Sequence, residues 1–198
     1  MWYIVTFIIC YLIAAMNPAI ILSKKILKQD IRSLGSKNAG TTNAIRTMGK
    51  GIGALVFILD ILKVVVSYGV ISLLSWLFKL DMNTTVKTLY ILASVIGHSY
   101  PIYYGFKGGK GVAVFLMSAL IVDFKTAMIC VAMGVVVILI SRMVSLGSIV
   151  GTCSLVILDI FTSTNYNFIL ICIVAILVAY NHRANIERII AGKENKLF

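Results

Sequence analysis

The stretch IGALVFILDILKVVVSYGVISLLSWLF at residues 52–78 decides the fold. Its charged residues are Asp60 and Lys63, and it exceeds the roughly 20 apolar residues that a helix needs to cross the hydrocarbon core of a bilayer. This stretch therefore predicts a membrane-spanning helix. Because Asp60 and Lys63 lie three positions apart, they share a helical face, and we expect them to pair inside a helix bundle.

The composition of the whole chain supports this prediction. Of the 198 residues, 60% are hydrophobic and 13% are charged, and the mean hydropathy is +1.01. A soluble domain could not hide so much apolar surface, so the composition predicts an integral membrane protein. The chain has two prolines and no long polar stretch, which predicts a single domain over residues 1–198. Residues 2–22 lack the basic leading region of a signal peptide, so we expect a retained span.

Seven apolar segments predict seven spanning helices, at residues 2–22, 52–78, 86–104, 111–123, 126–141, 146–162 and 166–181. The fourth is short, and a re-entrant hairpin turning at residues 123–126 is an alternative. With seven crossings, the loops on one side carry fourteen Lys and Arg and those on the other side carry three. Cytoplasmic loops carry the excess of Lys and Arg. We therefore expect an all-α membrane protein, a bundle of seven transmembrane helices with the N-terminus outside and the C-terminus cytoplasmic.

Charge and cysteine usage narrow the classes of partner. Eighteen Lys and Arg against seven Asp and Glu give a net charge of +11, which favours contact with phospholipid head groups or phosphorylated ligands. Nucleic acid is not expected as a partner of so apolar a chain. The four cysteines lie in apolar segments without C-x-x-C or Cys/His spacing, so we predict packing roles and neither a disulfide framework nor a metal site.

Three polar clusters lie on the basic side, at residues 33–46, 97–112 and 182–196. The first cluster reads SLGSKNAGTTNAIR. Gly35 and Gly40 permit backbone conformations that direct N–H groups at a phosphate near a helix N-terminus, and Arg46 adds a guanidinium group. The alternative is a solvated loop whose Asn and Ser side chains cap helices.

The second cluster contains GHSYP at residues 97–101 and GFKGGKG at residues 105–111. Its glycines permit close backbone approach to a ligand, and Lys107 and Lys110 supply positive charge. Gly111 stands where a nucleotide-binding P-loop requires Ser or Thr, so we expect no nucleotide cofactor. His98 could carry a proton, but a structural role at the helix end is favoured, since polar groups at that depth need partners.

The third cluster contains HRANIER at residues 182–188, followed by Gly192 and Glu194. We expect it to continue the last span as a helix, which would place His182 and Asn185 on one face and Glu187 on another. Ser145 and Ser148 lie at the cytoplasmic end of the sixth predicted span. They could complete an anion pocket or cap that helix.

With these clusters the chain resembles the bacterial glycerol-3-phosphate acyltransferases that use acyl phosphate, the PlsY family. The family motifs S-G-N-x-G-A-T-N-x-x-R, G-H-x-x-P with F-K-G-G-K-G-V-A, and H-R-x-N-I-x-R with G-x-E correspond to residues 36–46, 97–113 and 182–194. In two departures, Lys37 and Thr41 replace a glycine and an alanine of the first motif. A positive φ at Lys37 would therefore be strained.

The resemblance implies seven helices, an outer N-terminus and an acyl transfer. The 1-hydroxyl of sn-glycerol 3-phosphate would attack acyl phosphate, giving lysophosphatidic acid and inorganic phosphate, the first acylation step of phospholipid synthesis. Because the donor is already activated, no acyl-enzyme, cofactor or metal is expected. The expected location is the bacterial cytoplasmic (inner) membrane, with the active site facing the cytoplasm and the acyl chain among the membrane lipids.

The resemblance also implies residue roles. The residues expected to bind acyl phosphate are Ser36, Asn38, Gly40, Thr42, Asn43, Gly108 and Gly109. Those expected to bind glycerol 3-phosphate are Arg46, Lys107, Lys110, Ser145, Ser148, His182 and Asn185, and the catalytic residues among them are His182, Lys110, Arg46 and Asn185. We expect a substrate phosphate oxygen to take the hydroxyl proton, with His182 as the competing base.

Two other functions remain as alternatives. A carrier or channel for a phosphorylated solute could use the three clusters as a vestibule, although a carrier needs binding groups near the midplane rather than on one face. A metal-dependent transferase of nucleotide-linked phosphoalcohols would need clustered aspartates, whereas the five aspartates are scattered at positions 30, 60, 81, 123 and 159. Product formation in detergent and activity in EDTA would separate these functions.

Overall fold

The computed structural model describes residues 1–162 and 165–196, and all regular structure in those residues is helical. The α-helices are α1 (Trp2–Ala14), α2 (Pro18–Ile26), α3 (Thr41–Met48), α4 (Lys50–Phe78), α5 (Thr84–Ser99), α6 (Val112–Val122), α7 (Phe124–Ser141), α8 (Val144–Thr162), α9 (Phe168–Asn181) and α10 (Arg183–Ile190). Two short 3-10 helices, η1 (Ile31–Ser33) and η2 (Ile102–Tyr104), lie in the connections.

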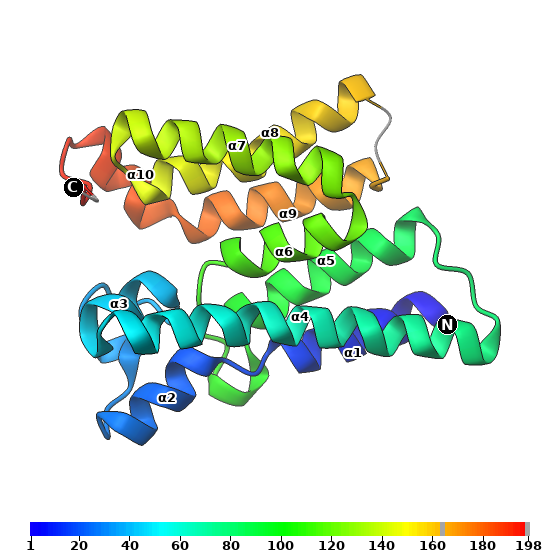
Figure 1. Cartoon of the computed structure of the whole chain (residues 1–198), viewed down its shortest axis with the longest axis horizontal. Helices are drawn as coiled ribbons and strands as arrows, with labels where there is room; N and C mark the ends of the chain where they lie inside the picture. The colour runs from blue at the N-terminus through cyan, green and yellow to red at the C-terminus, as the bar shows by residue number, and fades with distance from the viewer. Residues whose placement is uncertain (163–164, 197–198) are drawn as a thin grey trace.

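The helices form two layers with α5 and α6 between them (Figure 1). One layer holds α1 to α4, and the other holds α7 to α10. The short helices α2, α3 and α10 gather at the same end of the bundle as the C-terminus, and the N-terminus lies at the other end. All three polar clusters therefore lie at one end of the molecule, as their placement on one membrane side requires.

Each of the seven predicted spans is helical, although length and hydropathy alone mark fewer of them as spans. Four segments are long and apolar enough to cross a membrane: Trp2–Ile26, Lys50–Phe78, Phe124–Ser141 and Val144–Phe161. The α9 and α10 pair would be a fifth, and α6 is a shorter apolar helix. Large apolar side chains such as Trp76 (76% exposed) and Ile140 (80% exposed) cover the outside of the bundle, as a lipid-facing surface requires.

Two of the helices that were predicted to be continuous are broken in the structure. At Asn17 the first span is interrupted: the side-chain oxygen of Asn17 accepts a hydrogen bond from Ile20 N at 3.1 Å, and Pro18 begins α2. At His182 the axis turns by 60° between α9 and α10. The third cluster is helical, as predicted, but the prediction that it continues the last span is wrong, because α10 does not follow the axis of α9. The chain bends at His182, whose N–H is shared between the carbonyl oxygens of Val178 and Ala179.

Glycines bring α7 and α8 into backbone contact. A Cβ atom on Gly134 would lie 2.9 Å from the carbonyl oxygen of Gly147, and one on Gly151 would lie 3.0 Å from that of Cys130. Neither approach is possible for a larger residue without moving a helix. Small residues thus set the separation of these two helices, as they do in many membrane bundles.

The predicted pairing inside α4 is confirmed. Lys63 Nζ lies 2.8 Å from Asp60 Oδ1, and both side chains are buried. His98 of α5 also lies within contact distance of both side chains.

Candidate active site

The first cluster is a loop organised by one buried amide, that of Asn43 in the first turn of α3. Asn43 Oδ1 accepts a hydrogen bond from Ser36 N at 2.9 Å. Its Nδ2 donates to the carbonyl oxygens of Leu34 and Asn38, both at 3.0 Å, and of Ile31 at 3.2 Å. The side chain predicted to bind acyl phosphate is thus occupied by its own loop, which it holds in shape.

Left-handed backbone in this loop falls at Gly35 and at Lys37, where φ is +53° and +59°. A Cβ on Gly35 would overlap Asn43 Oδ1, so glycine is required there. Lys37 has a side chain, so its left-handed backbone is strained, as expected from the sequence. Gly40 has extended backbone, φ −153°, and begins α3 without a side-chain cap, which leaves the amides of that first turn open to a ligand.

The second cluster packs its glycines onto the end of α5. Gly108 N donates to Ser99 O at 2.9 Å, and Gly109 N donates to His98 O at 3.1 Å. A Cβ on either glycine would overlap an atom of His98. These two amides are therefore committed within the protein, and the glycines serve close packing of the loop rather than direct hydrogen bonding to a phosphate.

A polar cavity of about 280 Å³ lies where the clusters meet. The first cluster contributes Asn38, and the second contributes Tyr100 and the run from Lys107 to Lys110. The end of α9 and the start of α10 contribute Asn181 and Arg183. Three cationic side chains, Lys107, Lys110 and Arg183, line the cavity, so its charge suits an anionic ligand.

The third cluster is joined to the cavity through Lys110, whose Nζ donates to Asn185 Oδ1. Burial lowers the pKa of Lys110 to about 8, even though Glu194 opposes that shift. An ammonium group with this pKa remains mostly protonated at neutral pH and retains a donor for a phosphate oxygen.

Glu194 fixes the neighbours of Lys110. One carboxylate oxygen accepts hydrogen bonds from Asn185 Nδ2 at 2.6 Å and Ser145 Oγ at 2.7 Å, and the other accepts from Arg188 Nε at 2.7 Å. Burial alone would raise the pKa of Glu194, but these three donors outweigh it and hold the pKa below its usual value. The carboxylate therefore stays charged and keeps Asn185 and Ser145 in place.

His182 is buried at the bend between α9 and α10, and its Nδ1 lies 2.8 Å from the carbonyl oxygen of Val178. Because a carbonyl oxygen only accepts, Nδ1 must carry a hydrogen. In the neutral ring Nε2 then keeps its lone pair. The fold thus selects the tautomer that lets Nε2 accept a hydrogen bond from a hydroxyl group.

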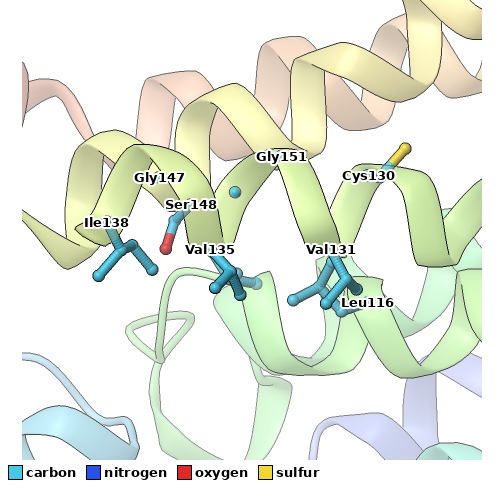
Figure 2. Close-up of a pocket in the computed structure, with 10 residues that line it drawn as sticks. Leu116, Cys130, Val131, Val135, Ile138, Gly147, Ser148 and Gly151 are labelled. Atoms are coloured by element: carbon cyan, nitrogen blue, oxygen red, sulfur yellow. The ribbon is translucent and has the colours of Figure 1, made fainter. Parts of the chain in front are cut away.

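An apolar cavity of about 80 Å³ lies between α6, α7 and α8. Leu116, Val131, Val135 and Ile138 project into it, and Ser148 lies at the same cavity (Figure 2). Ser148 Oγ donates to Val144 O at 2.8 Å, one turn earlier in α8. Of the two serines predicted at this helix end, Ser145 contacts the third cluster and Ser148 borders apolar surface.

The structure brings together one group of the predicted residues, since the polar cavity is lined by Asn38, Lys107, Gly108, Gly109 and Lys110. Asn185 contacts Lys110, and Ser145 is joined to Asn185 through Glu194. His182 lies between the lining residues Asn181 and Arg183 in the chain. Ser36, Thr42 and Arg46 are exposed on the first cluster. Arg46 has no hydrogen-bond or ion-pair partner within residues 1–162 and 165–196, and its side chain lies beside Gly35.

Sequence reasoning did not assign Tyr100, Asn181 and Arg183. Tyr100 OH donates to Asn181 Oδ1 at 2.6 Å, and Asn181 Nδ2 donates to Lys110 O at 3.4 Å. Arg183 stacks its guanidinium carbon 4.5 Å from the ring centre of Tyr180. One signal was available, since Asn181 and Arg183 flank His182, which sequence analysis did assign to the site.

Comparison with known proteins places this site in a family. Residues 4–192 match the sequence profile of the glycerol-3-phosphate acyltransferases. The chain belongs to this family. It is 42% identical over 198 residues to the glycerol-3-phosphate acyltransferase of Thermoanaerobacter pseudethanolicus, with 100% of this chain and 96% of that protein aligned. It is 37% identical over 195 residues to that of Clostridioides difficile, with 98% and 95% aligned.

Solved structures agree with the sequence matches. The acyltransferase is similar to the crystal structure of PlsY (YgiH), an integral membrane glycerol 3-phosphate acyltransferase, in its glycerol 3-phosphate form, with a TM-score of 0.84 and 33% identity. The lysophosphatidic acid form of PlsY gives a TM-score of 0.81. Each comparison covers 98% of this chain and 94% of the crystallised one. The acyltransferase is therefore an all-helical, multi-pass integral membrane enzyme, and the expected family is confirmed.

Proposed function

We propose that this acyltransferase moves an acyl group from acyl phosphate to the 1-hydroxyl of sn-glycerol 3-phosphate, giving lysophosphatidic acid and inorganic phosphate. The observation that carries the proposal is the polar cavity with Lys107, Lys110 and Arg183 in its walls, next to the Lys110–Asn185–Glu194 network. A cationic cavity that shares Lys110 with a neighbouring polar network suits two phosphorylated substrates bound side by side.

Lys110 stands between the two phosphoryl positions. Its amide and side chain belong to the glycine-rich loop, residues 105–111, while its Nζ reaches Asn185. Glycerol 3-phosphate would bind among Lys110, Ser145, His182 and Asn185. The phosphoryl group of the donor would bind at the open first turn of α3 and the adjoining cavity, where Asn38, Lys107 and Arg183 lie.

In the transfer step, the 1-hydroxyl oxygen attacks the acyl carbonyl carbon, and the bond from that carbon to the phosphate oxygen breaks. The bonding electrons leave with the phosphate, and its negative charge is held by the neighbouring cations. The proton of the 1-hydroxyl passes to a phosphate oxygen, while Nε2 of His182 accepts a hydrogen bond from the neighbouring 2-hydroxyl and so orients the substrate. Because phosphate is already a good leaving group, no covalent enzyme intermediate is required.

The acyl chain would run into the apolar cavity between α6, α7 and α8, where Ser148 is one of the lining residues (Figure 2). Its lining by Leu116, Val131 and Val135 suits an alkyl chain, and a chain longer than the cavity would extend among the lipids. The donor could thus enter sideways from the membrane.

We also propose seven crossings, with the N-terminus outside and the catalytic end facing the cytoplasm of a bacterial cytoplasmic membrane. The excess of Lys and Arg at that end supports this orientation. Proteolysis or labelling of single cysteines from either side of sealed vesicles tests it: label reaching residue 193 only from the cytoplasmic side is the expected result.

The deciding experiment supplies purified protein with palmitoyl phosphate and glycerol 3-phosphate in detergent and EDTA, and measures lysophosphatidic acid and released phosphate. Acyl-CoA and acyl carrier protein conjugates are the rival donors. Equal amounts of both products from acyl phosphate alone are expected. Turnover only with a rival donor would refute the donor, and a folded protein that moves glycerol 3-phosphate across vesicles without forming product would be the carrier.

A further inference from the structure

Three buried polar side chains have no part in the proposed reaction. Asp60 and Lys63 of α4 and His98 of α5 are only 1%, 6% and 4% exposed. Lys63 Nζ lies 2.8 Å from Asp60 Oδ1 and 3.0 Å from His98 Nδ1, and Asp60 Oδ1 lies 3.3 Å from His98 Nδ1. We call these three residues the buried triad. A charged group inside a membrane bundle is costly without a partner, so each member depends on the others.

The buried triad is attached to the break between α1 and α2. Lys63 Nζ donates to the carbonyl oxygen of Met16 at 3.0 Å. The next residue, Asn17, is fully buried and donates from Nδ2 to the carbonyl oxygen of Ala39 at 3.2 Å. Ala39 belongs to the first-cluster loop, residues 34–40. A short chain of contacts therefore leads from Lys63 to that loop.

The other end of the buried triad lies under the glycine-rich loop. A Cβ atom on Gly109 would overlap His98 Nε2 and would lie 2.8 Å from the carbonyl oxygen of Ala39. Gly109, the imidazole edge and Ala39 therefore pack against one another. The two loops meet directly over His98, and the backbone of His98 also accepts the hydrogen bond from Gly109 N.

We propose that Asp60, Lys63 and His98 are positioning residues, which hold the first-cluster loop and the glycine-rich loop at the separation that acyl transfer requires. This inference rests on the proposed placement of the two substrates. Reacting atoms must lie about 3 to 3.5 Å apart for efficient transfer, so a small shift between the loops costs rate even when both loops stay folded. The buried triad never touches substrate and acts through the loops.

The kinetic test compares Asp60→Asn, Lys63→Met and the double variant with wild type, far below the Tm of each protein in detergent. Each single variant is expected to lower kcat/KM for both substrates by about tenfold or more. The kcat/KM of the double variant is expected to be no lower than that of the less active single variant, because the effects of residues that act as one unit are not additive. Lys63→Arg keeps the charge and should recover most of the loss.

Ser94→Ala is the matched control. Ser94 is fully buried on α5 one turn before His98, and its Oγ has no hydrogen-bond partner among the described residues. Its kinetic constants should stay within about twofold of wild type. If Lys63→Met does not fold, His98→Asn carries the test, since it keeps both members of the Asp60–Lys63 pair and removes the imidazole that links this pair to Gly109.

A second readout measures the loops themselves. Spin labels are introduced at position 37 of the first-cluster loop and at position 103, in η2 directly before the glycine-rich loop, after replacement of the native cysteines. Both positions are exposed, and the distance between the labels is measured. Variants of the buried triad should broaden this distance distribution, and Ser94→Ala should not. A lower Tm with unchanged kinetic constants and an unchanged distribution would overturn the inference. If wild type rejects acyl phosphate, the proposed donor fails, but the spin-label distances, and KM for glycerol 3-phosphate measured with whichever rival donor is accepted, still test the buried triad.

Discussion

Lys110 and Asn185 lie 75 positions apart in the chain, and the ammonium group of Lys110 donates a hydrogen bond to the side-chain oxygen of Asn185. This contact joins the glycine-rich loop to α10. Because the same Asn185 is held by Glu194, the position of the ammonium group is set by residues of the third cluster.

Replacement of Lys110 by Met should lower kcat/KM for glycerol 3-phosphate by about 10- to 100-fold, since hydrogen bonds to charged groups contribute about 1.5 to 3 kcal/mol. Steady-state kinetics at saturating acyl phosphate measures this loss. Lys50→Met, at the exposed start of α4, removes an equal charge from the same end of the bundle and should have little effect. Equal losses in the two variants would show that only the overall charge matters.

The pKa of Lys110, about 8, predicts how affinity depends on pH. Burial favours the neutral amine, so the free enzyme loses this positive charge as the pH rises through about 8. KM for glycerol 3-phosphate should therefore be flat near neutral pH and rise above it, by up to about tenfold per pH unit. Lys110→Arg should move the rise to higher pH. A flat wild-type profile up to pH 9.5, well above about 8, would contradict this assignment.

His182→Ala tests the identity of the proton acceptor. If a phosphate oxygen takes the proton, the variant should raise KM for glycerol 3-phosphate while kcat falls by less than about tenfold, because a general base usually contributes about 10² to 10⁴. Single-turnover kinetics at saturating substrate separates the two effects. A fall in kcat of about a thousandfold would instead make Nε2 of His182 the base.

Filling the apolar cavity should change the preference for acyl chain length. Val131→Phe places a larger side chain in a space of about 80 Å³. The ratio of kcat/KM for palmitoyl phosphate to that for octanoyl phosphate should fall by about tenfold or more, since each methylene group in a hydrophobic pocket is worth about 1 to 3 kcal/mol. Val136→Phe on the exposed side of α7 is the control and should leave the ratio unchanged.

The Asp30–Arg32 pair predicts an acid limit to stability. Arg32 donates to both carboxylate oxygens, at 2.9 and 2.8 Å, and also to the carbonyls of Tyr104 and Lys107. The hydrogen bond from Arg32 lowers the pKa of Asp30 to about 2 from 3.8. Since the folded pKa is the lower one, the stabilisation is complete above about pH 4 and disappears as the pH falls toward 2. The difference in Tm between wild type and Asp30→Asn should shrink over that interval.

Local sequence signals predicted most of the fold, and the exceptions arise where distant groups meet. The seven apolar segments are all helical because lipid leaves their backbone no other partners. The breaks at Asn17 and His182 were not predicted: the Asn17 side chain caps α2 and also donates to the distant Ala39, and the bend at His182 is formed by contacts with the preceding turn of α9. The pairing of Asp60 with Lys63 follows from helical spacing, but the addition of His98 depends on how α5 packs against α4.

The candidate site divides in the same way. Motif spacing located the three clusters and identified Lys110 and Asn185, which the structure joins. Motif spacing did not distinguish the polar groups that are free to bind a ligand from those that hydrogen-bond within the protein. Asn43 is occupied by four backbone partners, and the amides of Gly108 and Gly109 donate to α5. The roles assigned to individual residues in binding either substrate stay predictions until the variants above are measured.

The contact between Gly134 and Gly147 limits how this enzyme can evolve a new donor range. Since two backbones meet there, no change of side-chain rotamer can separate α7 from α8, and any larger residue at either position would push both helices apart. The glycines in the wall of the apolar cavity therefore cannot be replaced, whereas side chains such as Leu116 of α6 and Val131 of α7 can. Descendants that accept bulkier or branched acyl groups would accumulate substitutions at these side chains and retain Gly134 and Gly147.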